Sequence, residues 1–463
     1  MPEPRFERSR AHQRRAHALI PGGAHTYAKG DDQMPEAMPV VIRRGEGCRV
    51  WDLDGNAYIE YGMGLRAVTL GHAEPRVVAA ATAAMRDGTN FSRPAAVEVA
   101  AAEAFLAAVP GADMVKFTKD GSSATTAAVK LARAATGRDA VAVCADHPFL
   151  SQNDWFIGTT PLGAGIPEAT RALTRRFPYG DLDALRARLA DRAVACVVME
   201  PVRDASDPTT YLRGVQALCR EAGTVFVLDE MITGLRWHRG GAQTRYGVRP
   251  DLSTFGKALG NGFAVSALAG RRELMELGGL ATDADRVFLL SATHGAETHA
   301  LAAAVEVLRI YETESVVEAL EARGAALRAL VAQVAARHGL GEAVAVAGRD
   351  SNLVCVTRDA EGRASQAFRT LFLQEMTRRG VLAPSFVVSA AHDAEALDRT
   401  AEALDGALAV YARALDAGST DGWLCGRPVQ PVFRRRAGLV WSDGGPAAAP
   451  DPTSASTFSP LHS

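Results

Sequence analysis

The feature that most constrains the fold is an alternation of short apolar runs and amphipathic segments, which begins near residue 96. Most of the apolar runs are hydrophobic at successive positions rather than at every second one, which predicts strands that are buried on both faces. Helices between such strands indicate a mostly parallel sheet covered on two sides, an α/β fold. The pattern predicts strands at 115–118, 140–145, 194–199, 225–228, 252–255 and 265–269, and helices at 124–135, 182–189 and 212–222.

The length of 463 residues predicts two or three lobes around one large domain. We expect an N-terminal segment, 1–85, that packs on the smaller domain and contains a hairpin closing at Asp54-Gly55. The large domain with the central sheet is expected at 86–300. A smaller C-terminal α/β domain is expected at 301–440, with a strand at 353–357 and a closing helix at 394–415. Residues 441–463 are rich in Pro, Ala and Ser and are predicted to be a disordered tail.

Charge, composition and missing motifs argue against several classes of function. The formal net charge of −2 gives no electrostatic reason to expect nucleic acid or an anionic membrane as a partner. The chain contains no uncharged run long enough to span a bilayer and begins without an apolar signal sequence, so we expect a cytoplasmic protein. Without H-E-x-x-H, clustered cysteines or G-x-S-x-G, neither a metal site nor a hydrolase is expected.

Two charged residues stand at the ends of predicted strands. Asp229 ends the run 225–228, where a carboxylate could hold a metal, act as a base, pair with a cationic ring nitrogen, or cap a helix. Lys257 follows the run 252–255 and is one of five lysines in an arginine-rich chain. Since arginine cannot be deprotonated, a retained lysine is a candidate amine nucleophile, although it could also be a surface residue.

A third motif, Lys119-Asp120-Gly121-Ser122-Ser123-Ala124, begins a predicted helix. Backbone N–H groups at this helix start, with the Ser122 hydroxyl, could bind a phosphate, or the serine could be a plain N-cap. In chain order, this turn, Asp229 and Lys257 supply what pyridoxal 5'-phosphate (PLP) needs. These needs are a phosphate anchor, a carboxylate for the pyridine nitrogen and an amine for a Schiff base.

The order of these motifs resembles the class III, fold-type I PLP-dependent aminotransferases, in the group that includes glutamate-1-semialdehyde aminomutase. The resemblance extends over nearly the whole chain and is carried by Pro21-Gly22-Gly23, Trp51-Asp52-Leu53-Asp54-Gly55-Asn56, Gly71-His72-Ala73, 131–138, Met199-Glu200-Pro201, Asp229-Glu230-Met231-Ile232-Thr233-Gly234-Leu235-Arg236 and Gly256-Lys257.

The resemblance implies a large domain with a mostly parallel sheet, a smaller α/β domain and PLP as cofactor. It implies that Lys257 is the Schiff-base lysine and proton shuttle, and that Asp229 pairs with the pyridinium. Gly121 and Ser122 would bind the phosphate, with Met231 beside the cofactor. Thr293 resembles a phosphate-binding threonine that the neighbouring subunit donates, which implies a homodimer with shared active sites.

Departures from the aminomutase motifs bear on the substrate. The motif whose aromatic residue stacks on the cofactor is Asp146-His147-Pro148-Phe149 here, so the stacking group is His147 or Phe149. The arginine that binds the substrate carboxylate corresponds to Lys29, and loss of its bidentate fork argues against a small amino-acid substrate. The segment 24–32 and the turn Thr293-His294-Gly295-Ala296-Glu297 are similar to enzymes of sugar and aminoglycoside amination.

We therefore expect an aminotransferase of antibiotic biosynthesis that moves an amino group from a donor such as L-glutamate to a hydroxyl-rich acceptor. The acceptor would be a carbonyl of an oxidised amino sugar or aminoglycoside intermediate. The alternatives are a glutamate-1-semialdehyde 2,1-aminomutase, an epimerase of an amine-bearing carbon, and a non-catalytic PLP-fold protein. The candidate substrate residues, each of which could also be an ordinary surface or capping residue, are Glu200, Tyr27, Lys29, His238, Glu297 and Asn90.

Overall fold

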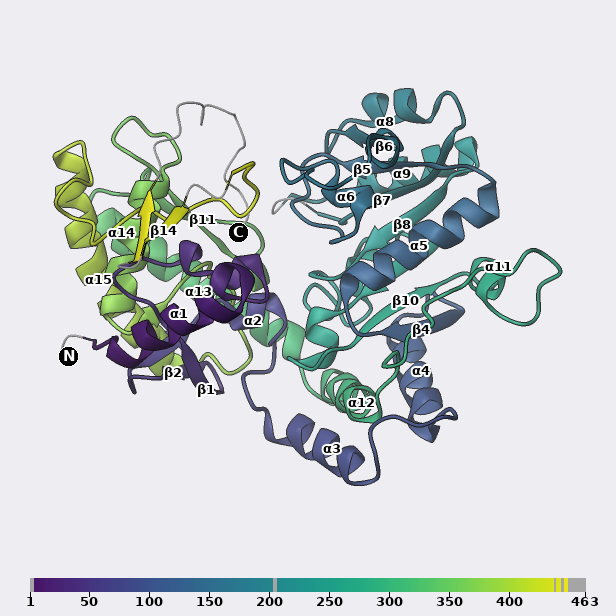
Figure 1. Ribbon diagram of the computed structural model, residues 1–463, viewed down its shortest axis with the longest axis horizontal. Coiled ribbons are helices and arrows are strands. Elements are labelled where there is room, and N and C mark those ends of the chain that lie inside the picture. The colour runs from purple at the N-terminus through teal and green to yellow at the C-terminus, as the bar shows by residue number, and fades with distance from the viewer. Residues whose placement is uncertain (1–3, 203–205, 437–438, 443–444, 449–463) are drawn as a thin grey trace. The chain divides into compact units, whose positions relative to one another are not determined.

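The computed structural model describes residues 4–202, 206–436, 439–442 and 445–448 (Figure 1). Contacts divide the chain into two compact units, one formed by Met1–Leu65 with Leu320–Ser463 and the other by Arg66–Ala319. The sequence pattern placed boundaries after residues 85 and 300, whereas the contacts assign 66–85 and 301–319 to the central unit. Each unit is described by itself below.

The central unit contains a seven-stranded sheet in the order β4-β10-β9-β8-β7-β5-β6. All neighbouring strands from β9 to β6 are parallel, and β10 alone in this sheet runs antiparallel to both of its neighbours. This confirms the predicted α/β fold and the six predicted strands, and it adds the edge strand β6. The strands are β4 Met114–Thr118, β5 Ala140–Cys144, β6 Thr174–Phe177, β7 Val194–Met199, β8 Val225–Asp229, β9 Leu252–Phe255 and β10 Ser266–Gly270.

Both faces of this sheet are covered, which explains why its strands are apolar at successive positions. Val141 and Val143 of β5 belong to the core that contains the alanine-rich helix α5 (Gly121–Thr136). The alternating residues Ala142 and Cys144 belong to a second core on α8 (Leu182–Leu189) and α9 (Thr209–Ala222). Figure 1 shows α5 along one side of the strands, apart from α8 and α9. The sheet edge where β7, β8 and β9 end is therefore free to carry polar side chains.

The remaining helices of the central unit surround this three-layer core. α12 packs against α3 and α4, and the short 3-10 helix η4 follows β9 directly. The bounds are α3 Pro75–Arg86, α4 Ala96–Ala108, α6 Asp154–Ile157, α7 Glu168–Ala172, α10 Gly241–Tyr246, η4 Lys257–Gly260, α11 Arg272–Met275, η5 Glu276–Gly278 and α12 Thr298–Thr313.

The other unit joins the two ends of the chain. Its main sheet has the order β1-β2-β3-β13, and β13 pairs parallel with β3. The predicted hairpin is present, with Asp54 and Gly55 in the turn between β2 and β3. The strands are β1 Ile42–Glu46, β2 Arg49–Asp52, β3 Ala57–Glu60, β11 Val344–Ala347, β12 Val354–Thr357, β13 Val381–Leu382, β14 Leu439–Ser442 and β15 Gly445–Ala448.

The helices of this unit include the predicted closing helix, which runs over Ala394–Asp416 as α15. β14, which begins two residues before the predicted tail, and β15, which lies in it, form an antiparallel pair, and residues 443–444 and 449–463 lie outside the described residues. The other bounds are α1 Glu7–Leu19, η1 Pro21–Gly23, η2 Tyr27–Lys29, η3 Asp31–Gln33, α2 Met63–Arg66, α13 Val316–Arg337, η6 Asp350–Asn352 and α14 Gln366–Arg378, of which α13 begins in the central unit.

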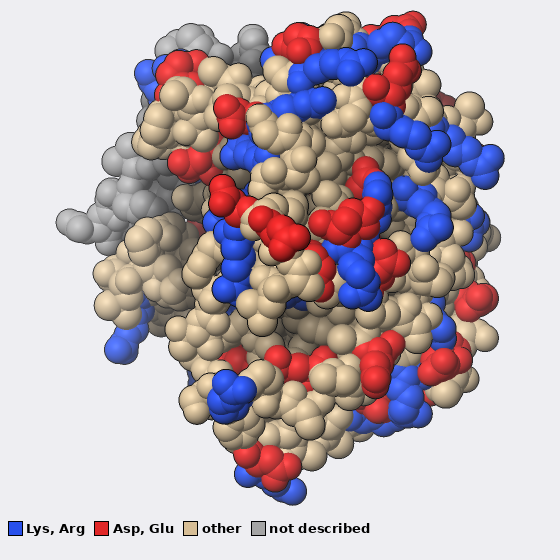
Figure 2. Space-filling model, turned by 90° about the vertical axis from the view of Figure 1, so that its right-hand side faces the viewer, with Lys and Arg blue, Asp and Glu red and all other residues tan. Residues whose placement is uncertain are grey.

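Acidic and basic side chains lie next to one another over the face that Figure 2 presents. Ion pairs such as Arg175 with Asp191 and Arg271 with Asp251 hold opposite charges together. In the part of the chain that the structure describes, no helix is long and apolar enough to cross a membrane.

Candidate active site

Three polar side chains meet where the parallel strands β7, β8 and β9 end. Met199 lies opposite Leu228, so Glu200 and Asp229 are level on neighbouring strands. Asp229 in turn lies opposite Thr254 of β9, and Lys257 follows this strand after Gly256. Carboxyl ends of parallel strands form the ligand-binding edge of such sheets, so the sheet itself brings these three residues together.

Asp229 is 3% exposed, and one of its two carboxylate oxygens accepts two hydrogen bonds. Its Oδ1 accepts hydrogen bonds from the Met231 N–H at 2.9 Å and from the Thr254 hydroxyl at 3.2 Å. Burial raises the pKa of Asp229 to about 6, against the charge of Lys257 and these two hydrogen bonds, which lower it. At neutral pH the carboxylate is ionised, and its Oδ2 atom can accept a further hydrogen bond.

Lys257 lies in the first turn after β9, in an unusual backbone conformation. Its φ of 43° falls in the left-handed region, which non-glycine residues rarely adopt and which clusters at functional sites. Burial lowers the pKa of Lys257, whereas the nearby carboxylates of Asp229 and Glu200 raise it. A lowered pKa increases the fraction of neutral amine, the form that attacks a carbonyl carbon.

Met231 connects the turn at Gly121 to the turn at Gly256. A Cβ added at Gly121 would lie 2.7 Å from the Met231 sulfur, and one added at Gly256 would lie 2.6 Å from the same atom. Such distances are shorter than real Cβ contacts, so both positions need glycine unless the methionine moves. Three motifs that are far apart in the sequence thus converge on one side chain that follows Asp229 by two residues.

The start of α5 offers donors to an anion. Asp120 is the N-cap residue, because its side chain accepts a hydrogen bond from the Ser123 N–H at 2.8 Å. Ser122 is therefore not the N-cap. Its hydroxyl oxygen accepts from the Gln152 N–H at 2.9 Å, an arrangement in which the hydroxyl proton can be donated outward.

His147 and Phe149, the two candidates for the stacking group, have different environments. His147 is 5% exposed, and its Nδ1 accepts a hydrogen bond from the backbone N–H of Glu200 at 3.1 Å. Phe149 is 46% exposed and packs edge-on against Phe156. The structure thus brings His147 to the strand ends beside Glu200, and it does not bring Phe149 there.

Glu200 as a whole residue is half-buried. Its carboxyl group, however, has little contact with water, which disfavours the charged form. Burial and the charge of Asp229 raise the pKa of Glu200 to about 8, against the opposite effect of Lys257 and Arg66. A protonated carboxyl beside Asp229 can donate a hydrogen bond, which an ionised one cannot.

The loop before α12 carries two further candidates. Thr293 is exposed, and its backbone oxygen accepts a hydrogen bond from the Asn90 side chain at 3.0 Å. Glu297 forms an ion pair with Lys119 and lies 3.5 Å from His294, and these contacts lower the pKa of its carboxyl. The ion pair holds Glu297 near the start of α5, and the charge of Lys119 balances that of its carboxylate.

Of the other predicted substrate residues, one lies in the turns after β8 and two lie in the other unit. His238 is exposed, and its Nδ1 accepts a hydrogen bond from the Gly240 N–H at 3.0 Å. Tyr27 and Lys29 are exposed residues of η2, which belongs to the unit that joins the chain ends. Their role in substrate binding stays a prediction.

Two arginines were missed as site residues by the sequence analysis. Arg236 is fully buried, and its guanidinium donates a hydrogen bond to the backbone oxygen of Arg66 at 2.8 Å. Burial lowers the pKa of Arg236 to about 10, and both arginines lie close enough to Lys257 to lower its pKa. The sequence carries no signal for this proximity, because 170 residues separate the two arginines.

Comparisons with known proteins agree with this geometry. The family model of class III aminotransferases matches residues 27–404. A glutamate-1-semialdehyde 2,1-aminomutase of Methanothermobacter thermautotrophicus is 33% identical over 415 residues, which cover 85% of this chain and 96% of that relative. The protein of the same name in Chloroflexus aurantiacus is 36% identical over 288 residues, 59% of this chain. That match spans only 65% of the Chloroflexus relative.

A solved structure supports the same assignment. The PLP internal aldimine form of the FumI protein from Sphingopyxis sp. MTA144 is similar with a TM-score of 0.81 and 30% sequence identity. The alignment covers 90% of this chain and 100% of that one. The fold is therefore that of fold-type I PLP enzymes, as the sequence predicts.

The strand-end residues fit PLP in chemical type. The amide donors at the start of α5 and the Ser122 hydroxyl suit its phosphate, and Lys257 suits its aldehyde. Both hydrogen bonds given to Asp229 converge on Oδ1, so Oδ2 suits the ring nitrogen. Since the family model spans most of the chain and these residues suit the cofactor, the chain belongs to the class III aminotransferases, which are PLP-dependent enzymes.

Proposed function

We propose that this enzyme moves an amino group between carbon atoms of small molecules, with Lys257 as the amine that holds PLP. The observation that carries this proposal is the strand-end cluster, in which Lys257 follows β9 beside the carboxylate of Asp229 on β8. Burial lowers the pKa of Lys257, which favours the neutral amine that this role needs.

Each residue of the cluster has a distinct role in the proposal. When bound, PLP supplies an electrophilic aldehyde and a ring that accepts electrons. Asp229 keeps the ring nitrogen protonated, and the start of α5 with Ser122 holds the phosphate. The Lys257 amine takes a proton from one substrate carbon and returns it to another, as a general base and then a general acid.

The first candidate reaction is a shift of the amino group within one molecule, as in a glutamate-1-semialdehyde 2,1-aminomutase. The relatives of that name, 33% and 36% identical to this chain, support it. None of the proteins compared above is described as a sugar or aminoglycoside aminotransferase. An aminomutase needs no external amino donor, which separates it from an ordinary aminotransferase.

The second candidate is transfer from a donor such as L-glutamate to a hydroxyl-rich carbonyl acceptor, such as an oxidised amino sugar or aminoglycoside. The observation that favours it is Lys29, which stands where the aminomutases have a carboxylate-binding arginine. The turn 293–297 departs from the aminomutase motif as well, and its Glu297 is paired with Lys119.

A single-turnover assay separates these candidates. Purified enzyme is supplied with glutamate-1-semialdehyde and no other amine, and the formation of 5-aminolevulinate is followed. We expect product under these conditions if the chain is an aminomutase. If product forms from an oxidised aminoglycoside only after L-glutamate is added, the second candidate holds and the first is wrong.

We also propose a homodimer in which Thr293 serves the partner's phosphate site. The exposure of Thr293 supports this, since a residue donated to a second subunit must lie at the surface of the first. Mixing inactive K257A with a T293A variant would regenerate one complete site per heterodimer. Activity well above that of either variant alone is expected, and no gain in a mixed dimer isolated with two affinity tags would contradict shared sites.

A further inference from the structure

The loop that precedes α6 packs on the first two turns of α5. The Thr125 hydroxyl donates a hydrogen bond to the backbone oxygen of Leu150 at 2.9 Å. The backbone N–H of Gln152 donates to the Ser122 hydroxyl oxygen at 2.9 Å. Ser151, which lies between these two loop residues, is fully buried, and its hydroxyl donates to the Ser122 backbone oxygen at 3.4 Å. The loop therefore contacts Ser122 at both its backbone and its side chain.

Thr126 is the residue of α5 on which the side chains of this loop converge. Its Oγ1 accepts hydrogen bonds from the indole N–H of Trp155 at 2.8 Å and from the side-chain amide of Asn153 at 2.7 Å. The Ser151 hydroxyl lies 3.2 Å from the same atom. A hydroxyl oxygen has two lone pairs, and the two N–H groups occupy both of them. The Thr126 proton is therefore donated to Ser151.

The direction of the next hydrogen bond follows from the same reasoning. Ser151 Oγ accepts the proton of Thr126 and also the backbone N–H of Asn153 at 3.2 Å. Its own proton is then donated to the Ser122 backbone oxygen. Hydrogen bonds thus run in one direction, from Thr126 through Ser151 to Ser122. They fix the loop on both sides of Gln152, whose N–H contacts the Ser122 hydroxyl.

This network determines where the Ser122 hydroxyl proton points. A serine hydroxyl can rotate unless its partners fix it. Because Ser122 Oγ accepts the Gln152 N–H, its proton is directed away from the loop, and the residue is 8% exposed. A donor that already points at an anion does not have to be ordered when the anion binds, so more of the hydrogen bond contributes to affinity.

We propose that Thr126, Ser151 and Trp155 are positioning residues that hold the Ser122 hydroxyl as a donor to the cofactor phosphate. This inference rests on the proposed function, in which the start of α5 binds the phosphate of PLP. Thr126 lies one turn further along α5 than Ser122 and acts through the loop at Gln152. Valine at position 126 has nearly the same shape but removes the acceptor of two N–H groups and the donor to Ser151.

The first test compares PLP with pyridoxal, which has the same aldehyde and ring but lacks the phosphate. Full-length wild type, T126V and T126S are freed of cofactor and titrated with each aldehyde, and the Kd is followed by protein fluorescence. T126V should raise the Kd for PLP by about 5- to 10-fold and leave the Kd for pyridoxal unchanged. T126S keeps the hydroxyl and should recover most of the affinity for PLP. An equal rise for both aldehydes, or no rise for PLP, would overturn the inference.

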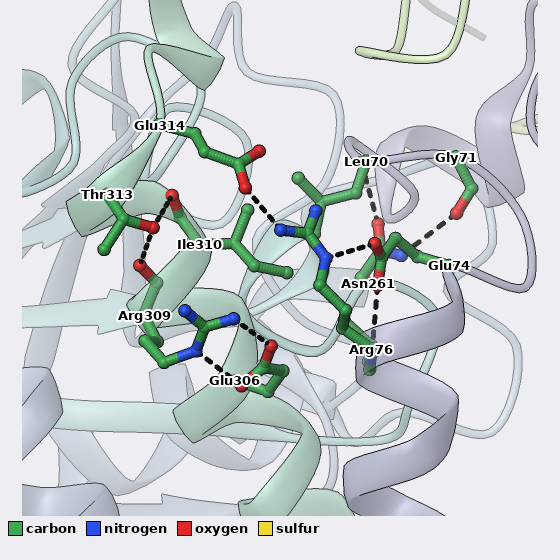
Figure 3. Close-up of polar contacts among 11 residues, drawn as sticks. Leu70, Gly71, Glu74, Arg76, Asn261, Glu306, Arg309, Ile310, Thr313 and Glu314 are labelled. Carbon is green, nitrogen blue, oxygen red and sulfur yellow. Dashed lines mark hydrogen bonds and ion pairs between the residues drawn. The ribbon is translucent and has the colours of Figure 1, made fainter.

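Two other threonines provide matched controls in the same unit. Thr136, at the end of α5, donates to the backbone oxygen of Ala132 at 2.7 Å. Thr313, at the end of α12, donates to the backbone oxygen of Arg309 at 3.0 Å (Figure 3). T136V and T313V each remove a hydroxyl from a helix without altering the loop, so their Kd for PLP should equal that of wild type. A rise in either control as large as in T126V would show a general loss of helix stability and contradict the inference.

A double-mutant cycle tests whether Thr126 acts through Ser122. S122A alone should raise the Kd for PLP by about 10-fold or more, because a donor to a charged phosphate is lost. Adding T126V to S122A should then change the Kd by less than about 2-fold, since no hydroxyl is left to position. Fully additive effects would show that Thr126 acts elsewhere. If wild type lacks lysine-bound PLP, the proposed function itself fails. If the lysine carries PLP and T126V binds it as wild type does, only the positioning role fails.

Discussion

The Thr254 hydroxyl donates a hydrogen bond to Asp229 Oδ1 across the register of β9 and β8, at 3.2 Å. Both side chains are buried, and burial disfavours the ionised form of the aspartate. Burial raises the pKa of Asp229 to about 6, and the Thr254 hydrogen bond is one of the contacts that lower it. In the proposed function this charge pairs with the cofactor ring, so the pairing would depend in part on a threonine on the next strand.

Replacing Thr254 with valine should move the acidic limb of the kcat/KM profile to higher pH. The hydrogen bond favours the ionised carboxylate, so its loss raises the pKa of Asp229 and leaves less of the active form near pH 6. One such bond is worth about 1 kcal/mol, which corresponds to a shift of roughly 0.7 pH units. T254S keeps the hydroxyl and should retain the wild-type limb; an identical shift in both variants would contradict this role.

Replacing Glu200 with glutamine should change how stability depends on pH. Burial and Asp229 raise the folded-state pKa of Glu200 from 4.5 to about 8, so the fold favours the neutral carboxyl. Its contribution is fully present below about pH 4.5 and is lost as the pH rises through 8. The amide of E200Q cannot ionise, so E200Q should gain stability relative to wild type between pH 5 and pH 9.

Urea denaturation of the PLP-free proteins at several pH values measures this difference. The control is E46Q, because Glu46 is exposed on β1, where a change of charge should not alter the pH dependence. A free-energy difference between E200Q and wild type that stays constant from pH 5 to pH 9 would contradict the raised pKa.

Substituting Gly121 with alanine should destabilise the protein through Met231. The new Cβ would lie 2.7 Å from the methionine sulfur. The Met231 side chain also packs closely against Gly256, which limits how far it can move away. Overpacking of this kind costs about 1–3 kcal/mol. Truncation in M231A should relieve the clash, so a double-mutant cycle of G121A with M231A should give a favourable coupling energy. Strict additivity would mean that Met231 does not join the two turns.

Variants of His147 and Phe149 should differ in PLP affinity. His147 is buried beside the Glu200 backbone, whereas Phe149 is exposed and packs on Phe156. H147A should therefore weaken PLP binding, measured as Kd by fluorescence titration, by about 10-fold or more. F149A should bind PLP as wild type does. The reverse order of affinities would identify Phe149 as the stacking group.

The central sheet could be predicted because strands such as β5, β7 and β8 are buried on both faces and so carry long apolar runs. β6 was missed because its sequence Thr-Arg-Arg-Phe lies at the sheet edge, where half of the side chains need no burial. The antiparallel direction of β10 leaves no trace in composition, since its residues are as buried as those of its parallel neighbours.

The strand-end part of the site could be predicted as well, since parallel strands place their carboxyl ends together. Asp229 is the last residue of β8, Glu200 directly follows β7, and Lys257 lies two residues beyond β9. Arg66 ends α2 and Arg236 lies in a turn after β8, and a hydrogen bond from the Arg236 guanidinium to the Arg66 backbone oxygen joins them although 170 residues separate them. The choice between His147 and Phe149 depends on burial, which the sequence of a loop does not reveal.

The most direct test of the account is to locate the lysine that carries PLP. The purified enzyme is reduced with borohydride and digested, and the peptides are analysed by mass spectrometry. The chain has five lysines, at 29, 116, 119, 130 and 257, so the assignment is unambiguous. The account predicts the pyridoxyl mass on Lys257 alone and its loss in K257R. The same mass on another lysine, or on none, would contradict it.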